Sequence, residues 1–280
     1  MNRLIDEVEF VIFDTETTGL EFQKGDRIVE VAAIRFKGDV QLDSFHSLIN
    51  SGQPVSEAAF NVNKITPLML SQSPPPDSVI PKFREFISGC CLMSYNIGFD
   101  LGFLNNELKI LNQIQLEGIY VVDILKMARR IIPGLERYPL WFVAKELGIS
   151  FQQEHRAFSD VELALKVFYK LKDIMRSKGI LELEKLLCLA SIDLSTIESI
   201  NSKKIIEIQE AINLKLELKI KYLSGSGAQI SDRKVAPKEI KQENGRSYLV
   251  GYCYLRREER SFRIDSILDL ETIHENKASS

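Results

Sequence analysis

Four carboxylates in three separated segments constrain this chain more than any other feature. They are Asp14 and Glu16, Asp100, and Asp160. The first pair follows Val8 to Phe13, a mostly apolar run that is typical of a buried strand in an α/β sheet. Acidic side chains gathered in one folded pocket repel one another unless cations lie between them. The set therefore indicates a site for hard divalent cations.

The spacing of the first pair also has an ordinary explanation. Two carboxylates two residues apart are common on exposed strands, where they need no catalytic role. Here they stand at the end of a strand that the sequence predicts to be buried, and a buried charge needs a partner. Side chains at i and i+2 of a strand point to the same face, so Asp14 and Glu16 can bind one metal together.

The order of elements predicts an α/β fold for the first part of the chain. Three apolar runs separated by glycine turns predict an antiparallel meander: residues 8–16, 26–36 and 43–50. An amphipathic helix at 79–88 follows three prolines, and short strands at 91–95 and 118–123 then alternate with helices. Asp100 and Asp160 each stand at the start of a predicted helix.

Residues 8 to about 176 resemble the DEDDh 3′-to-5′ exonucleases, a group that includes the proofreading epsilon subunit of bacterial DNA polymerase III. Three ordered motifs carry the resemblance: Asp14-x-Glu16 followed by Thr-Thr-Gly-Leu, Asn96-x-x-Phe99-Asp100, and His155-x-Ala157-x-x-Asp160. The resemblance implies a ribonuclease H-like fold in which the four acids converge. A sister subgroup has tyrosine four residues before the last aspartate, where this chain has Arg156, so the histidine subtype is the better assignment.

The resemblance also implies the chemistry of the site. Asp14, Glu16, Asp100 and Asp160 would ligate two divalent cations, and His155 would deprotonate the attacking water. Two such ions can activate a water and stabilise the leaving oxygen of a phosphodiester. Ligands that are all oxygen favour Mg²⁺ or Mn²⁺ over zinc.

Substrate contacts are expected beside these ligands. Thr17 and Leu20, in the turn after Glu16, and Asn96 and Phe99, in the middle motif, are the predicted substrate-binding residues. The chain departs from many relatives at two places, which carry Ser94-Tyr95 and Asn63-Lys64 instead of histidine-containing pairs. Neither place supplies a metal ligand, so the departures bear on substrate preference.

The composition changes near Ser177. A leucine-rich helix at 181–190 and a polar segment at 191–204 are interpreted as a connector, and alternating strands from 216 onward resemble a WYL domain, a small β-rich module with an SH3-like barrel core. Ser247 replaces the tryptophan of its namesake triad, whereas Tyr248-Leu249 remain. The predicted organisation is an exonuclease domain (1–178), a connector (179–204), a WYL-like domain (205–272) and a tail (273–280).

The WYL-like segment is basic in a chain whose net charge is −3. Residues 233–263 hold nine basic and four acidic side chains, a local net charge of +5. Phosphate attraction and base stacking would suit a single strand or a nucleotide effector, with Arg233, Tyr248, Arg260 and Arg263 as candidate ligand-binding residues. A solvated basic face of a small barrel is the alternative.

Together these features predict a metal-dependent 3′-to-5′ exonuclease that acts on single-stranded nucleic acid, DNA in preference to RNA. An exoribonuclease, or a ligand-sensing regulator that uses the nuclease domain as a nucleic-acid clamp, remains as an alternative. No apolar stretch approaches the ~18 residues of a membrane span, and the first residues lack a signal-peptide profile. A cytoplasmic protein without membrane contact is expected.

Overall fold

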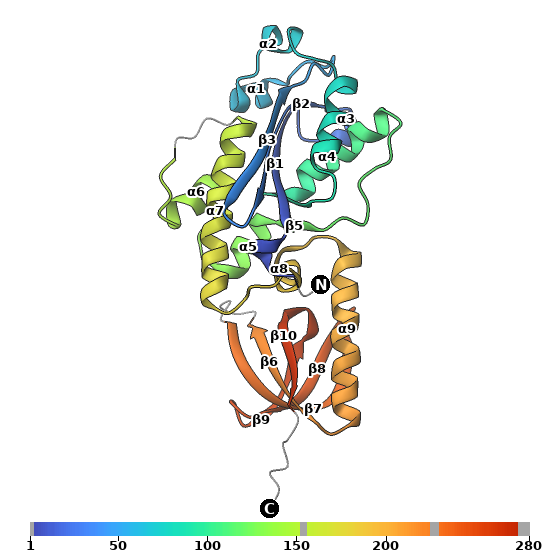
Figure 1. Ribbon diagram of the computed structural model, residues 1–280, viewed down its shortest axis with the longest axis vertical. Coiled ribbons are helices and arrows are strands. Elements are labelled where there is room, and N and C mark those ends of the chain that lie inside the picture. The colour runs from blue at the N-terminus through green and yellow to red at the C-terminus, as the bar shows by residue number, and fades with distance from the viewer. Residues whose placement is uncertain (1–2, 152–155, 225–229, 274–280) are drawn as a thin grey trace, which may run out of the picture.

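The computed structural model describes residues 3–151, 156–224 and 230–273, which form two sheets connected by helices (Figure 1). The N-terminal sheet has the strand order β3-β2-β1-β4-β5. Its strands are β1 (Glu9–Thr17), β2 (Ile28–Lys37), β3 (Val40–Leu48), β4 (Cys91–Ser94) and β5 (Val121–Asp123). Since β1 pairs antiparallel with β2 and parallel with β4, the strand that carries the first two acids is central.

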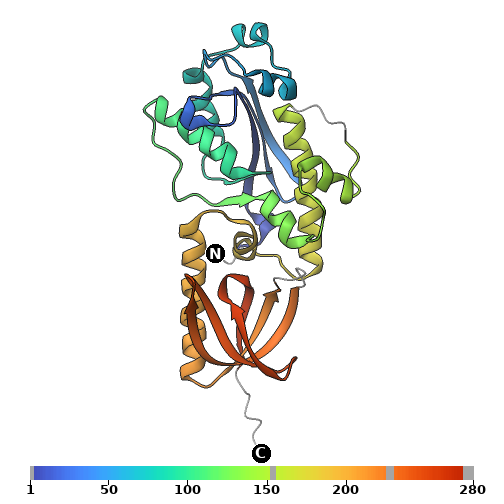
Figure 2. The same ribbon diagram turned by 180° about the vertical axis from the view of Figure 1, so that it is seen from behind.

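Helices cover both faces of this sheet (Figures 1 and 2). They are α1 (Glu57–Asn63), α2 (Pro67–Ser71), α3 (Pro76–Phe86), α4 (Ile97–Ile110), α5 (Ile124–Ile131), α6 (Leu140–Glu146) and α7 (Ala157–Ser177), with short 3₁₀ turns at Ile5–Glu7 and Phe22–Lys24. Phe10 of β1 packs on Phe168 of α7 at one face, and Phe13 packs on Phe83 of α3 at the other. Alternate residues of β1 therefore enter two separate cores.

The predicted meander and the helix–strand alternation that follows it are confirmed. Strands predicted at 26–36 and 43–50 are β2 and β3, displaced by at most three residues. The helix predicted from Val79 begins earlier, at Pro76, because proline is compatible with the first turn of a helix, where its missing N–H has no partner to lose.

The polar segment at 191–204 was interpreted as a connector, and this interpretation of its local structure is wrong. After α8 (Leu183–Ala190), residues 194–204 form the first half of α9 (Leu194–Asn213). The Asp193 carboxylate caps this helix by accepting the Thr196 N–H at 2.7 Å. A narrow buried stripe at three- and four-residue spacing was hidden among polar residues: Thr196, Ile200, Lys204, Ile208 and Ala211.

The C-terminal sheet is entirely antiparallel, with the strand order β10-β6-β7-β8-β9. Its strands are β6 (Glu217–Leu223), β7 (Ile230–Glu243), β8 (Arg246–Cys253), β9 (Glu258–Arg263) and β10 (Ile267–Ile273), with a 3₁₀ turn at Ile264–Ser266. Ile208 and Ala211 of α9 share a core with Leu218 and Leu249 of the sheet. The predicted β-rich module is confirmed.

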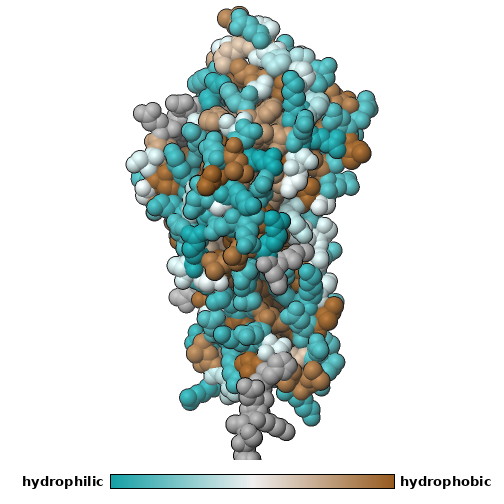
Figure 3. Space-filling model, in the orientation of Figure 1, coloured by the Kyte–Doolittle hydropathy of each residue, from teal (hydrophilic) through white to brown (hydrophobic). Residues whose placement is uncertain are grey.

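The two sheets are not separated by an open linker. Leu223 and Leu268 of the C-terminal sheet belong to the same buried cluster as Leu186 of α8 and Phe168 of α7. In Figure 1, α8 lies between the two sheets, close to the N-terminus. Hydrophilic side chains cover most of the face seen in Figure 3, with hydrophobic ones scattered among them. No helix in the described residues has the length and apolar character that crossing a membrane requires.

Candidate active site

Three of the four predicted metal ligands meet at one end of β1. Asp14 and Glu16 lie on the face of β1 toward α7, and Asp160 lies in the first turn of α7. Each offers a carboxylate oxygen, and the three oxygens lie within 4.8 Å of one another. All three residues are partly exposed, so the cluster is not closed off from solvent.

Asp100 lies beside this group and is held by other contacts. It is 3% exposed, in the first turn of α4. Its Oδ1 accepts hydrogen bonds from the Thr15 N–H at 2.9 Å and the Thr15 hydroxyl at 2.8 Å, and its Oδ2 accepts one from the Ser94 hydroxyl at 2.5 Å. A carboxylate has about four lone-pair directions, so about one remains for a cation.

Burial and mutual repulsion raise the pKa values of these acids. Burial, and then the charges of Asp160, Glu30 and Asp100, raise the pKa of Glu16 to about 8. Burial raises the pKa of Asp100 to about 6, against the lowering effect of its hydrogen bonds. The pKa of Asp14 is well above its usual range because of burial and the neighbouring Asp100 charge. A divalent cation would compensate this negative charge, so the donor set fits a hard metal ion.

Asn63 contacts Glu16, and the sequence did not reveal this contact. This residue, 1% exposed at the end of α1, hydrogen-bonds the Glu16 carboxylate through its side chain and thereby opposes the rise in the pKa of Glu16. Its Oδ1 also accepts the Ile65 N–H at 3.0 Å. The only signal in the sequence was the departure at Asn63-Lys64 from the histidine-containing pair of many relatives.

The predicted substrate-binding residues lie at the end of β1, in the turn after it and at the start of α4. Thr17 is buried and donates its hydroxyl to the Gly19 carbonyl, whereas Leu20 is 80% exposed. Asn96 is exposed at the start of α4, and Phe99 packs on Phe103 with the ring centroids 4.8 Å apart. Their contacts with substrate stay predictions. His155, the predicted general base, lies outside the described residues.

The candidate residues of the C-terminal module have protein partners of their own. Arg263 makes a two-pronged ion pair with Asp265, and Arg260 pairs with Glu258 at 2.7 Å. Arg233 donates from Nε to the Ser231 hydroxyl at 3.1 Å, while one of its terminal nitrogens is buried without a hydrogen-bond partner. Tyr248 lies opposite Arg263 in the β8–β9 register. Ligand binding by these four residues stays a prediction.

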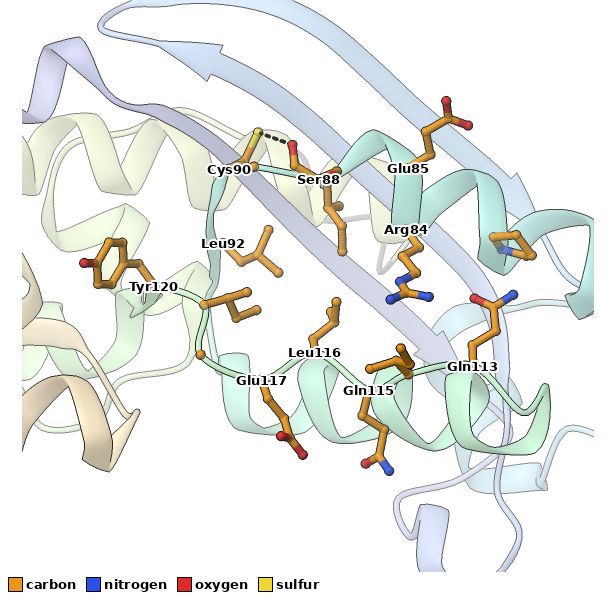
Figure 4. A pocket seen from close by; sticks show the side chains of 16 residues that line it. Arg84, Glu85, Ser88, Cys90, Leu92, Gln113, Gln115, Leu116, Glu117 and Tyr120 are labelled. Carbon is orange, nitrogen blue, oxygen red and sulfur yellow. Dashed lines mark hydrogen bonds between the residues drawn. The ribbon is translucent and has the colours of Figure 1, made fainter.

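A groove of about 890 Å³ lies elsewhere, between the end of α3 and residues 113–120 (Figure 4). Figure 4 shows Arg84 and Leu116 directed into this groove and Glu117 directed away from it. None of the four acids lines it. The groove is therefore separate from the acid cluster, and we assign it no role.

Two parts of the chain match known protein families. Residues 11–168, just over half of the chain, match the family described as Exonuclease, and residues 204–272 match the WYL domain family. The chain belongs to the exonuclease family. The resemblance inferred from the motifs is confirmed for both parts of the chain.

Similar proteins include the DNA polymerase III PolC-type of Bacillus subtilis (strain 168), 35% identical over 179 residues. The PolC-type protein of Clostridium perfringens is 33% identical over 171 residues. These matches cover 64% and 60% of this chain but only 12% of each relative. The nuclease domain of 3′hExo, described as a DEDDh family member bound to rAMP, has a TM-score of 0.53 at 15% identity, over 63% of this chain and 96% of that chain. This likeness confirms the ribonuclease H-like fold.

Proposed function

We propose that this protein is a divalent-metal-dependent 3′-to-5′ exonuclease that releases nucleotides from single-stranded DNA ends. The observation that carries the proposal is the meeting of Asp14, Glu16 and Asp160, with their oxygens within 4.8 Å of one another. Beside them Asp100 keeps a lone-pair direction available. This arrangement matches what two Mg²⁺ or Mn²⁺ ions need from a protein, namely oxygen ligands on fixed elements.

The residues of the chain have separate tasks in this proposal. When bound, the metal ions would supply a more acidic water and charge stabilisation at the leaving oxygen. Asp14, Glu16, Asp100 and Asp160 hold those ions, and Asn63 orients Glu16. His155 takes the proton of the attacking water, and Thr17, Leu20, Asn96 and Phe99 hold the terminal nucleotide.

The preference for DNA rests on the relatives. The PolC-type proteins that share 33–35% identity with the N-terminal part are named as DNA polymerases. The experiment that tests the substrate uses matched DNA and RNA oligomers labelled at the 5′ end, with Mg²⁺ or Mn²⁺. We expect a descending ladder with DNA and slower hydrolysis of RNA. Faster hydrolysis of RNA would make the protein an exoribonuclease, and no hydrolysis of either would favour the ligand-sensing clamp.

We further propose that the C-terminal module assists substrate capture. Its basic stretch at 233–263 has a local net charge of +5, which would attract phosphates. Binding of a nucleotide effector at the same module is the alternative, and it predicts a higher melting temperature when a nucleotide is added. Long-strand affinity would then be unchanged by mutations in the basic stretch.

A further inference from the structure

A buried carboxylate next to the acid cluster has no place in the chemistry described above. Glu30 of β2 is fully buried and lies directly opposite Glu16 in the β1–β2 register. A lone acid in the middle of an apolar strand must be compensated by hydrogen bonds or opposite charges. Its partners therefore indicate what the residue is for.

Most of these partners belong to the start of α7. The Arg156 guanidinium donates from Nε to one Glu30 oxygen at 3.0 Å and from a terminal nitrogen to the other at 2.6 Å. The Ala157 N–H, at the first residue of α7, donates to Glu30 at 3.3 Å. One further contact comes from β3, where His46 Nε2 lies 2.7 Å from Glu30.

These contacts tie one end of a helix to the sheet. The first N–H groups of a helix have no partner within it, and a carboxylate placed there satisfies them and interacts favourably with the helix dipole. Asp160 lies one turn further along α7 and its N–H donates to the Arg156 carbonyl at 3.0 Å. The position of Asp160 relative to Asp14 and Glu16 therefore depends on where β2 holds the first turn of α7.

We infer that Glu30 is a positioning residue for the metal site. It anchors Arg156 and the first turn of α7, and this turn carries Asp160. The inference rests on the proposed function, because it takes the acid cluster as the metal site. Glu30 itself does not join the cluster; it acts on Asp160 through the start of the helix. Substitution of groups that orient metal ligands in this way commonly lowers metal affinity by about 10- to 100-fold.

The chain offers a matched control. Glu107 of α4 is also fully buried, accepts two hydrogen bonds at 2.7 Å from the Arg27 guanidinium, and accepts the Ile28 N–H at 3.2 Å. Like Glu30, it is held by an arginine and a backbone N–H, but among the described residues it has no histidine partner, and it lies away from α7. It stands two turns beyond Asp100 on α4, and Thr15 and Ser94 hold Asp100 in place. Glu107→Gln and Glu30→Gln should lose similar amounts of stability, but only the second should disturb the cluster.

The test measures Mn²⁺ binding to the full chain by isothermal titration calorimetry, so that it does not depend on hydrolysis. We expect Glu30→Gln to weaken binding by at least tenfold, and Glu107→Gln to change it by less than twofold. Arg156→Gln distinguishes the positioning of Asp160 from a direct effect of the Glu30 and Arg156 charges on the bound cation. Removing the arginine leaves more negative charge near the cluster and would tighten binding if only the field mattered, whereas loss of positioning weakens it.

The outcomes distinguish the inference from the proposed function. Tenfold weaker Mn²⁺ binding in both Glu30→Gln and Arg156→Gln supports the inference, even if the wild-type protein hydrolyses no oligomer tested. Wild-type affinity in either variant overturns it, and so does tighter binding in Arg156→Gln. If Glu30→Gln does not fold, Arg156→Gln decides alone, because the glutamine amide can still donate one hydrogen bond to the buried Glu30 carboxylate. Failure of the proposed function would instead appear as a wild-type protein without hydrolytic activity.

Discussion

Asp14, Glu16 and Asp160 lie so close together that none can be considered alone. If they bind the same cations, as proposed, removing any one carboxylate takes a ligand from the same ions, so the effects of single substitutions should resemble one another. Asp100 belongs to the same unit through its position beside Asp14, although three hydrogen bonds already hold its oxygens. In the proposed site these four residues therefore form one unit, built on two helices and a strand.

We expect Asp14→Ala, Glu16→Ala or Asp160→Ala to lower turnover by on the order of 10³ or more, and chelation of the metal to abolish it. Initial rates on a labelled oligomer measure this. Asp43→Ala is the control, since Asp43 is exposed on β3 and accepts the N–H of its neighbour Ser44. Activity retained in Asp14→Ala would contradict the mechanism.

Asn63 allows a finer test of how Glu16 is oriented. Asn63→Asp keeps the oxygen that accepts the Ile65 N–H but replaces the amide donor by a carboxylate that repels Glu16. We expect the Mn²⁺ concentration for half-maximal rate to rise by about 10- to 100-fold. Asn63→His, which restores a donor, should lie closer to the wild type. Equal metal requirements in all three proteins would show that Asn63 only supports the turn.

At the scale of elements, the sequence predicted those parts whose signal is local. The apolar run before Asp14 and the motif around Asp160 each identified their own element. Glu30 was missed because a single acid within an apolar strand does not show which distant group compensates it. The Arg156 partner lies 126 residues away. Helix α9 was missed because its buried stripe is narrow and its remaining surface is polar.

The element most relevant to the predicted domain boundary is α8. Its side chains Leu183, Leu186 and Leu187 are buried in the same cluster as β1 and α7. The Ile5 N–H donates to the Leu181 carbonyl at 2.8 Å, and Arg130 of α5 donates to the Cys188 carbonyl at 2.9 Å. A boundary at residue 178 would separate α8 from these partners.

We therefore expect a fragment ending at residue 193 to retain hydrolysis of short oligomers and one ending at 180 to lose much of its stability. Burial of the α8 leucines contributes on the order of 5 kcal/mol, at about 1.5 to 3 kcal/mol for each side chain. That is a large share of the 5 to 15 kcal/mol typical of a whole domain. Urea denaturation of both fragments measures the difference. Equal urea midpoints for the two fragments would instead support a domain boundary at residue 178.

At the scale of the whole molecule, buried contacts connect the nuclease part to the C-terminal sheet. Lys204 of α9 is buried, and its ammonium group donates to the Ile267 carbonyl of β10 and to the Cys188 sulfur of α8 at 3.0 Å. Lys185 of α8 pairs with Asp269 of β10 at 2.9 Å. A strand captured by the C-terminal module would therefore be held at a fixed position relative to the nuclease.

The role of the module in capture can be tested with two arginines whose surroundings differ. Arg260 is exposed and, among the described residues, pairs with the exposed Glu258, so it can exchange this partner for a phosphate at little cost. Arg263 is held by both oxygens of Asp265. Burial raises the pKa of Asp265, but the ion pair with Arg263 outweighs burial and brings this pKa below its usual range.

If the module binds single strands, Arg260→Ala should reduce the slope of log affinity against log salt concentration by about 0.7 to 1. Arg263→Ala should act mainly on stability, by about 1 kcal/mol, because it leaves Asp265 without its arginine and with only the Ser266 hydroxyl among the hydrogen bonds given for the described residues. Fluorescence anisotropy with labelled single strands at several salt concentrations gives the slopes, and thermal melts give the stabilities.

Lys166→Ala removes an exposed lysine on α7 and controls for a general loss of positive charge. An unchanged slope in Arg260→Ala, with affinity equal to the wild type, would mean that its side of the module does not contact the strand.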